Sequence, residues 1–305
     1  MLAAFITTVL WSLSVVCATR SARLLGGTEA NFWRLALATP LLALWAHTFG
    51  QGLKGDSFAL FLLSGVIGVG ADVFLFQSLP RIGSRLSVLI IQCFSAISAA
   101  TVEWLWLGTR LTVWQAGASG IILAGVAVAL APAKHLEAKK GVLAAGIAFS
   151  FLAAFGNGFG AVLSRKAYAV AAAAHQDIDG ATAAYQRLIG GLFVAALCLL
   201  VVKRREIAAQ LTHSDPPRLP DAQKWRRAWR WVALNAIAGQ TLGVSTYQWA
   251  LKTTPTGLVL AIVATTPLVV IPFASAVEGE KIELRAVAGG VMAVAGAVLL
   301  VLART

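Results

Sequence analysis

Ten apolar blocks divide this sequence, and they constrain its fold more than any other feature. They lie at 2–19, 30–47, 57–79, 84–107, 112–131, 141–163, 183–202, 229–251, 256–277 and 284–303. About 20 apolar residues are enough for an α-helix to cross the hydrocarbon core of a bilayer. The strands of a membrane barrel would instead alternate apolar and polar residues over about ten positions. The blocks therefore predict an all-α integral membrane protein with ten transmembrane helices.

The composition excludes most soluble functions. Hydrophobic residues make up 58% of the chain and charged residues 12%, whereas soluble domains are about 25% charged. The net charge of +12 is typical of nucleic-acid binding, but the apolar blocks leave almost no room for a domain that could bind nucleic acid. We therefore expect a multi-pass protein of the cell (inner) membrane, with the lipid bilayer as a partner and no nucleic-acid partner, as a monomer or homodimer.

The two halves of the chain align with each other as repeats, which we place at 1–133 and 141–305. The matched residues include Val88 with Val259, Gly108 with Gly279, Gln77 with Gln248 and Arg34 with Arg187. Because each repeat holds five blocks, an odd number, the second copy enters the membrane from the opposite side. The sequence thus predicts two inverted five-helix repeats, an arrangement typical of carriers that work by alternating access.

Four charged residues lie well inside the blocks, namely Arg34, Asp72, Glu103 and Arg187. A charge at the bilayer centre costs about 2.5–3.5 kcal/mol on insertion scales, so each is expected to face the protein interior with a partner. Their depths predict one pair, Arg34 with Asp72, near one mouth and a second, Arg187 with Glu103, near the other. We hypothesise that Arg34, Asp72 and Glu103 act in gating or proton coupling. The alternative is that the arginines extend to lipid phosphates and the acids lie in wet interfaces.

Polar and aromatic residues near mid-membrane are candidates for substrate binding. Trp11, Ser12 and Asn157 combine an aromatic ring with a hydroxyl or an amide, which suits an amphipathic organic compound. Packing remains an alternative role for Trp11. Gly243 stands in the second repeat where the first has Asp72, so Arg187 is freer to meet an anionic group. Tyr247 and Gln248 lie at a similar depth and complete this set of candidates.

Small residues and prolines predict how some helices pack. Two pairs spaced by seven residues, Ala118 with Gly125 and Gly289 with Gly296, predict close helix contacts. Pro267 and Pro272 interrupt the block at 256–277, and Pro267 leaves the carbonyl four residues earlier, that of Val263, without its helical partner. The freed group predicts either a polar point in a cavity or a structural kink.

The segment that leads into the eighth block combines tryptophans with arginines at 225–231. Tryptophan rings lie at headgroup depth and arginines reach lipid phosphates, so this segment is expected to form a turn of interfacial helix. We favour simple anchoring there over a specific lipid site.

The sequence resembles the ten-helix carriers of the drug/metabolite transporter superfamily, of the EamA type, over nearly its whole length. The resemblance rests on Trp11-Ser12, Arg34, Arg187, Thr266-Pro267, Gly279-Glu280-Lys281-Ile282, Gly289-Gly290 and Ala295-Gly296. The first repeat departs from the pattern, with Thr109 in place of Glu280 and Ala96 in place of Pro267. The resemblance implies a central cavity lined by spans one to four and six to nine, and it leaves the substrate open.

These observations favour a secondary transporter that exports a small organic metabolite, such as an amino acid, another metabolite or a drug-like compound. The first alternative is a membrane-embedded lipid-modifying enzyme, but the histidines His47, His135, His175 and His213 are scattered. We therefore expect no catalytic residues, no metal site and no cofactor. The second alternative is a sugar-phosphate or nucleotide-sugar exchanger, which would require several basic residues in the cavity, where only two are candidates.

Two arguments about orientation disagree. The resemblance places both termini in the cytoplasm. Most lysines and arginines, however, lie in loops on the opposite face from the termini, and basic loops are typically cytoplasmic. The sequence leaves this point open.

Overall fold

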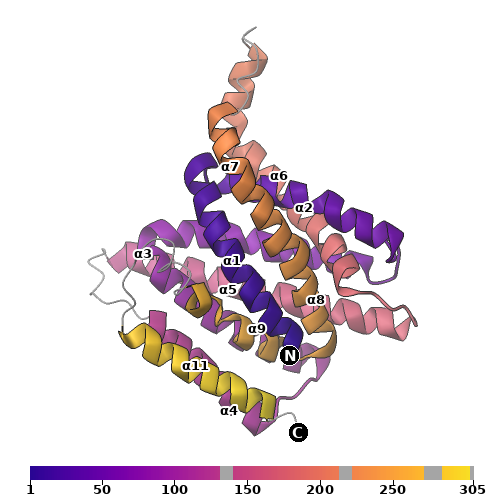
Figure 1. Ribbon diagram of the computed structural model, residues 1–305, viewed down its shortest axis with the longest axis vertical. Helices are drawn as coiled ribbons and strands as arrows, with labels where there is room; N and C mark the ends of the chain where they lie inside the picture. Colours follow the sequence, from indigo (N-terminus) through magenta and orange to yellow (C-terminus); the bar gives the residue numbers. More distant parts are fainter. Residues whose placement is uncertain (131–139, 213–221, 271–283, 303–305) are drawn as a thin grey trace.

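Helices form all the regular structure that the computed structural model describes, which covers residues 1–130, 140–212, 222–270 and 284–302 (Figure 1). The helices are α1 (Leu2–Leu25), α2 (Gly27–Thr48), α3 (Phe58–Leu107), α4 (Val113–Leu130), α5 (Lys140–Ala173), α6 (Gly180–Thr212), α7 (Ala222–Asn235), the π-helical segment η1 (Ala236–Gly243), α8 (Val244–Thr253), α9 (Thr256–Val263) and α11 (Leu284–Leu302). The motif at 279–282, Pro272, His135 and His213 lie outside the described residues.

Seven of the described helical segments are long and apolar enough to cross a membrane. They are Leu2–Leu25, Phe58–Leu75, Leu86–Leu107, Val113–Leu130, Gly141–Ala173, Gly180–Arg204 and Leu284–Leu302. The expected block at 30–47 corresponds to α2, whose Asn31 and Arg34 lower its mean hydropathy. The block at 229–251 is divided among α7, η1 and α8, and α9 ends at Val263. Seven of the ten expected spans are thus found as long apolar helices.

Helix α3 contains two of these spans and reverses direction between them. The hydroxyl of Ser78 donates a hydrogen bond to that of Ser87, although nine residues along a straight helix would separate them by about 13.5 Å. Pro80 lies between the two serines and is the residue type that bends helices. The first arm passes Gly160 of α5 at Ser64, and the second passes Ala154 of α5 at Ser95. The helix therefore forms a hairpin whose two arms both pack on α5.

The corner between α1 and α2 depends on one glycine. Gly26 has φ 85° and ψ 150°, a backbone conformation that only glycine adopts without strain. The turn lets α2 follow α1 directly, with its first residue at Gly27. Near this corner Glu29 of α2 forms an ion pair with Lys203 of α6 (2.6 Å).

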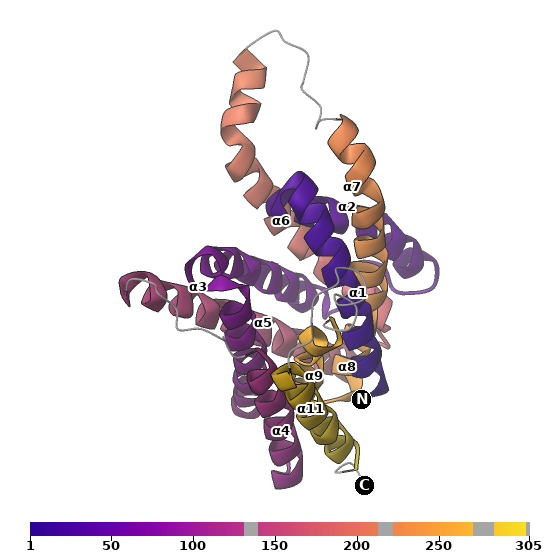
Figure 2. The same ribbon diagram turned by 60° about the vertical axis from the view of Figure 1, so that its left-hand side comes forward.

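Helices α4 and α11 form a close pair, which lies away from α2 and α7 in both views (Figures 1 and 2). A Cβ atom added to Gly125 would lie 2.6 Å from the carbonyl oxygen of Gly289 and the amide of Ala293. A Cβ atom on Gly296 would lie 3.0 Å from the carbonyl oxygen of Ala118. The expectation that these small residues form helix contacts is confirmed, because only small residues let the two backbones approach so closely.

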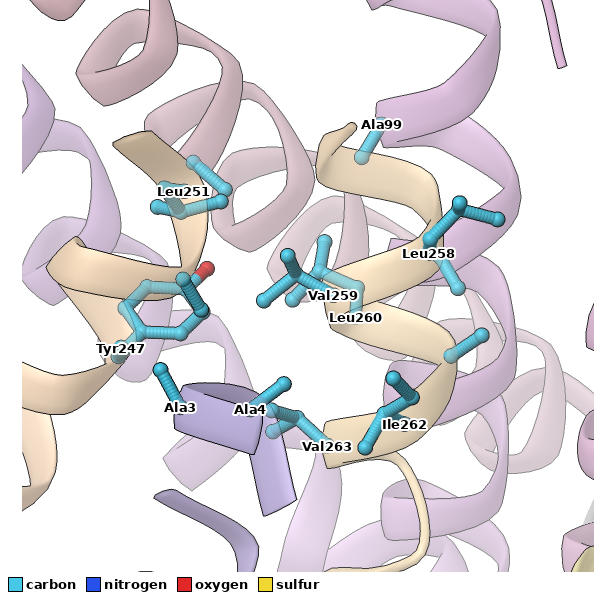
Figure 3. Packing of buried hydrophobic residues seen from close by; sticks show 14 of the residues in the cluster. Ala3, Ala4, Ala99, Tyr247, Leu251, Leu258, Val259, Leu260, Ile262 and Val263 are labelled. Carbon is cyan, nitrogen blue, oxygen red and sulfur yellow. The ribbon is translucent and has the colours of Figure 1, made fainter. Parts of the chain in front are cut away.

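The largest apolar core lies at the end of the molecule that holds the N-terminus. Tyr247 and Leu251 of α8 face Val259 of α9, and Ala3 and Ala4 of α1 lie beside them (Figure 3). These five residues are at most 6% exposed. The tightly packed end of the bundle is therefore this one, which matters for access to the site described next.

Candidate functional site

A cavity of about 310 Å³ lies between the two halves of the chain. Its volume is at the lower end of the range for sites that bind small molecules, about 300–1,000 Å³. The polar, charged and aromatic residues of its wall are Trp11, Ser14, Arg34, Asp72, Gln92, Asn157, Arg187, Gln240 and Thr266. They come from α1, α2, both arms of α3, α5, α6, η1 and the segment after α9, so no single element forms the site.

Five of the nine residues singled out from the sequence line this cavity, namely Trp11, Arg34, Asp72, Asn157 and Arg187. Three others, Ser12, Tyr247 and Gln248, lie in the layer of buried residues behind the wall. The last, Glu103, lies outside the cavity wall and belongs to a separate contact described below.

The guanidinium of Arg187 in α6 is hydrogen-bonded to the protein through one of its nitrogens, and its other nitrogens are available to a ligand. Its Nη1 atom donates hydrogen bonds to the Ser64 hydroxyl, the Gly160 carbonyl (3.2 Å) and the Ser164 hydroxyl (3.2 Å). Gly68 of α3 leaves the space that the Nη2 atom occupies, since an added Cβ would collide with it. In the described part of the chain, the Nε and Nη2 groups have no hydrogen-bond partner. Arg187 can therefore offer a fixed pair of donors to an anionic group in the cavity.

Arg34 and Asp72 share the cavity with Arg187. The Nε atom of Arg34 donates to the Asn31 amide oxygen (2.8 Å), and the Asp72 carboxylate interacts electrostatically with both arginines. Within the described ranges Asp72 has no ion pair closer than 4.0 Å. The expectation that Arg34 and Arg187 lie near opposite mouths is wrong, because both arginines line one cavity together with Asp72. Two arginines and one aspartate therefore line the cavity.

Trp11 is fixed by both its nitrogen and its ring. Its Nε1 atom donates to the Gly239 carbonyl of η1 (3.2 Å), and its ring centroid lies 5.1 Å from that of Tyr247. An added Cβ on Gly243 would lie 2.6 Å from the indole ring, so glycine at this position makes room for it. π-Helical segments are frequent at functional sites. Trp11 thus forms an apolar wall, with Tyr247 supporting it from behind.

Ser12 joins α1 to the broken end of α9. Its hydroxyl donates to the carbonyls of Thr8 (2.7 Å) and Thr266 (3.1 Å). The Val263 carbonyl, which Pro267 deprives of its helical partner, accepts a hydrogen bond from the Thr266 hydroxyl (2.7 Å). The freed carbonyl is therefore satisfied locally and forms a structural kink, while Thr266 itself reaches the cavity wall.

Gln248 lies behind the cavity wall and is connected to Arg187 through Ser164. Its Nε2 atom donates to the Ser164 hydroxyl (3.2 Å), which also receives a hydrogen bond from Arg187. Its Oε1 atom is buried without a hydrogen-bond partner among the described residues. The chain Gln248–Ser164–Arg187 links α8 to the cavity through buried groups.

The predicted pair between Glu103 and Arg187 is wrong. Glu103 is 2% exposed, and its carboxylate accepts hydrogen bonds from Arg165 Nε (2.5 Å) and from the Thr256 amide (2.5 Å). Arg165 also donates to the carbonyls of Leu251 (2.8 Å) and Thr254 (3.1 Å). The pair therefore ties α3 and α5 to the corner between α8 and α9. The depth estimate missed Arg165 because it follows the end of the block at 141–163.

Two amide residues of the wall, Gln92 and Gln240, were not singled out from the sequence, and neither was Ser14. Each glutamine is an amide inside a long apolar stretch, and polar residues at membrane depth usually face a cavity or another helix. The rule applied to the charged residues would have found both. In the described part of the chain, no group of three or more His, Cys, Asp or Glu side chains is arranged to hold a metal ion.

Comparisons with known proteins agree with this architecture. The EamA-like transporter family matches residues 1–131 and 144–302. One solved structure, described only as the crystal structure of a protein, superposes with a TM-score of 0.74 at 16% identity and covers 100% of this chain and 98% of its own. At that identity the likeness shows the fold alone. No curated protein matches the sequence.

Proposed function

Because this chain belongs to the EamA-like transporter family, within the drug/metabolite transporter superfamily, we propose that it is a secondary transporter of a small organic metabolite. It is a multi-pass membrane protein, and we place it in the cell (inner) membrane. Transport runs by alternating access, in the export direction. The observation that carries this proposal is the cavity, which both halves of the chain line with charged and aromatic residues.

The helix contacts support ten spans in two inverted repeats. In this scheme α1, α2, the two arms of α3 and α4 correspond to α5, α6, α7–η1–α8, the α9 region and α11. The contacts then occur in equivalent pairs. Helix α1 packs on α7 and η1, and its counterpart α5 packs on the first arm of α3. Helix α2 packs on η1, and its counterpart α6 packs on the first arm of α3. The α4–α11 pair joins two equivalent helices. A two-fold relation of this kind is what rocking carriers use.

The two ends of the cavity differ, which fits one state of an alternating-access cycle. At the end that holds the N-terminus, the apolar core of Figure 3 fills the bundle. Polar contacts join the loops there, including Gln186 Nε2 to the Gly52 carbonyl (2.9 Å) and an ion pair between Lys252 and Asp177. The cavity wall instead continues through Val15, Leu35 and other residues toward the corner between α1 and α2. The end near the N-terminus is the closed one in this state.

The charge of the cavity indicates the kind of substrate. Two arginines and one carboxylate favour a compound that carries a negative group, which the free donors of Arg187 bind in a bidentate manner. Trp11 provides a flat apolar surface for the rest of the molecule. The substrate is thus a small organic anion or zwitterion with an apolar part.

A thermal-shift screen of the purified protein against amino acids and organic acids tests this proposal. We expect a carboxylate-bearing compound to raise the unfolding temperature, because a ligand that binds only the folded state stabilises it. Arg187→Gln should weaken the affinity for that compound about tenfold or more, the effect of losing hydrogen bonds to a charged group, about 1.5–3 kcal/mol.

Arg110→Gln is the matched control, because Arg110 is exposed outside the cavity. Its ligand response should equal that of the wild type. A compound that stabilises wild type and Arg187→Gln equally would contradict the assignment of this cavity as the binding site. Proteoliposomes that show no uptake or release of the bound compound would contradict transport itself.

A further inference from the structure

The face of α7 that points away from the bundle is basic and aromatic. Arg226, Arg227 and Arg230 are exposed, and their spacing of three and four residues places them on one side of the helix. Trp229 lies between them in sequence, with 47% of its surface exposed. We call these four residues the α7 face. Together with Gln223, Trp231 and Leu234 they line a shallow hollow on the helix.

The opposite side of α7 is fixed against the bundle. Ala228, Val232 and Asn235 are at most 1% exposed. The ring of Trp225 lies 5.1 Å from that of Trp33 in α2. At the border between the two sides, the guanidinium of Arg20 in α1 lies 4.5 Å from the centre of the Trp231 ring. This packing prevents the helix from turning, so the α7 face is held outward.

The positive charge of the α7 face has no partner of opposite sign in the described ranges. The ion pairs there join Arg165 to Glu103, Lys203 to Glu29 and Lys252 to Asp177, and none involves the α7 face. Three guanidinium groups on one turn of helix repel one another unless an external anion neutralises them. An anion that meets this face must come from outside the described part of the chain.

The position of the face along the helix indicates the source of that anion. Arg226 and Arg230 are separated by about 6 Å along the axis, which fits within one headgroup layer of about 5–7 Å. The next exposed side chains of the same segment are the apolar Leu234 and Ile237, as expected for entry into hydrocarbon. Tryptophan is enriched at this boundary.

We propose that the α7 face binds the phosphate of an anionic phospholipid. The arginines donate paired hydrogen bonds to phosphate oxygens, and Trp229 packs beside the glycerol and upper acyl region. Because α7 continues without interruption into η1, which lines the cavity at Gly239 and Gln240, a bound lipid holds one wall of the cavity in place. The proposal rests on the membrane location and does not require the transport activity.

Lipid binding to the delipidated full-length protein in detergent tests this proposal, with affinity measured by native mass spectrometry. Dioleoyl phosphatidylglycerol should bind about tenfold more tightly than dioleoyl phosphatidylcholine, and added salt should reduce the difference. Arg227→Gln combined with Arg230→Gln should remove this preference. Arg227→Lys combined with Arg230→Lys should keep part of it, because the charge remains and the bidentate geometry is lost.

Lys54→Gln combined with Arg110→Gln is the matched control, since both residues are exposed and lie outside the α7 face. It removes the same charge and should leave the lipid preference unchanged. An equal loss in the control would overturn the proposal, as would equal binding of the two lipids. If sn-glycerol 3-phosphate competes as strongly as the lipid, the site binds free phosphates and the proposal is also wrong.

Discussion

The charged residues inside the apolar blocks have two different environments. Arg34, Asp72 and Arg187 line the cavity, whereas Glu103 lies in a buried ion pair with Arg165. A buried charge needs a partner wherever it lies, so the sequence shows the requirement without showing which partner meets it. The folded chain separates the residues that can meet a substrate from one that joins helices.

Asp72→Asn tests whether the cavity carboxylate couples transport to protons. Asparagine keeps the size of the side chain and cannot take up a proton, so transport driven by a pH gradient should fall at least tenfold. Exchange of substrate across the membrane without a gradient should persist. Proteoliposomes with an imposed pH gradient give the measurement, once a substrate is identified.

The purified Asp72→Asn variant should retain the thermal-shift response to the bound compound, which serves as the folding control. Gradient-driven transport at the wild-type rate would show that Asp72 does not carry the proton.

Several helices are bent or interrupted, and the sequence predicts only some of these interruptions. The reversal of α3 lies between the blocks predicted at 57–79 and 84–107, and the end of α9 lies just before Pro267. The π-helical segment η1 has no such signal. Its Gly239 carbonyl accepts a hydrogen bond from the Trp11 indole, and these two groups come from opposite halves of the chain.

The start of α6 depends on Asp179, whose carboxylate accepts hydrogen bonds from the amides of Ala181 (2.9 Å) and Thr182 (3.0 Å) and from the Trp45 indole (3.1 Å). Partial burial raises the pKa of Asp179, but the hydrogen bonds from Thr182, Ala181 and Trp45 outweigh it and lower the pKa below its ordinary value. Asp179 thus caps the start of α6.

Asp179→Ala should lower the free energy of unfolding by about 1 kcal/mol at neutral pH, as the loss of an N-terminal cap does. A carboxylate with a lowered pKa stabilises the fold above its unfolded-state pKa, and this advantage disappears as the pH falls through the folded-state value. The difference between wild type and Asp179→Ala should therefore shrink in acid. Thermal unfolding in detergent at several pH values measures it.

Asp179→Asn is the control, because asparagine also caps helices but carries no charge. Asp179→Asn should lower the free energy of unfolding less than Asp179→Ala does. The stability of the asparagine variant should not change as the pH passes through the pKa of this carboxylate. The difference in free energy of unfolding between wild type and Asp179→Ala could instead stay constant down to strongly acid pH. That result would contradict the role given to the ionised carboxylate.

At the scale of the whole molecule, the proposed inverted repeats place particular loops on opposite sides of the membrane. Lys54 lies in the loop between α2 and α3, at the end where Gln186 binds the Gly52 carbonyl. Arg227 lies near the start of α7, at the end where Glu29 meets Lys203. Figure 2 shows the ends of α6 and α7 extending beyond the other helices on this side.

Lys54→Cys and Arg227→Cys should therefore react with a membrane-impermeant thiol reagent from opposite sides of sealed vesicles. The background for both is a variant without Cys17, Cys93 and Cys198, the native cysteines. Labelling of both positions from the same side would contradict the ten-span arrangement. A reporter fused after Thr305 adds the absolute orientation, with activity in the cytoplasm expected from the family resemblance.

The sequence alone determined the helical membrane architecture, the family and five of the nine polar, charged and aromatic residues of the cavity wall. These follow from local properties, because continuous apolar length selects helices in lipid and a charge at membrane depth must find a polar partner. Only the tertiary structure decided which partner each charge has. Arg187 and Asp72 meet at one cavity, while Glu103 pairs with Arg165, because helix rotation and tilt are set by packing between helices and are not encoded in the depth of a residue along its own helix.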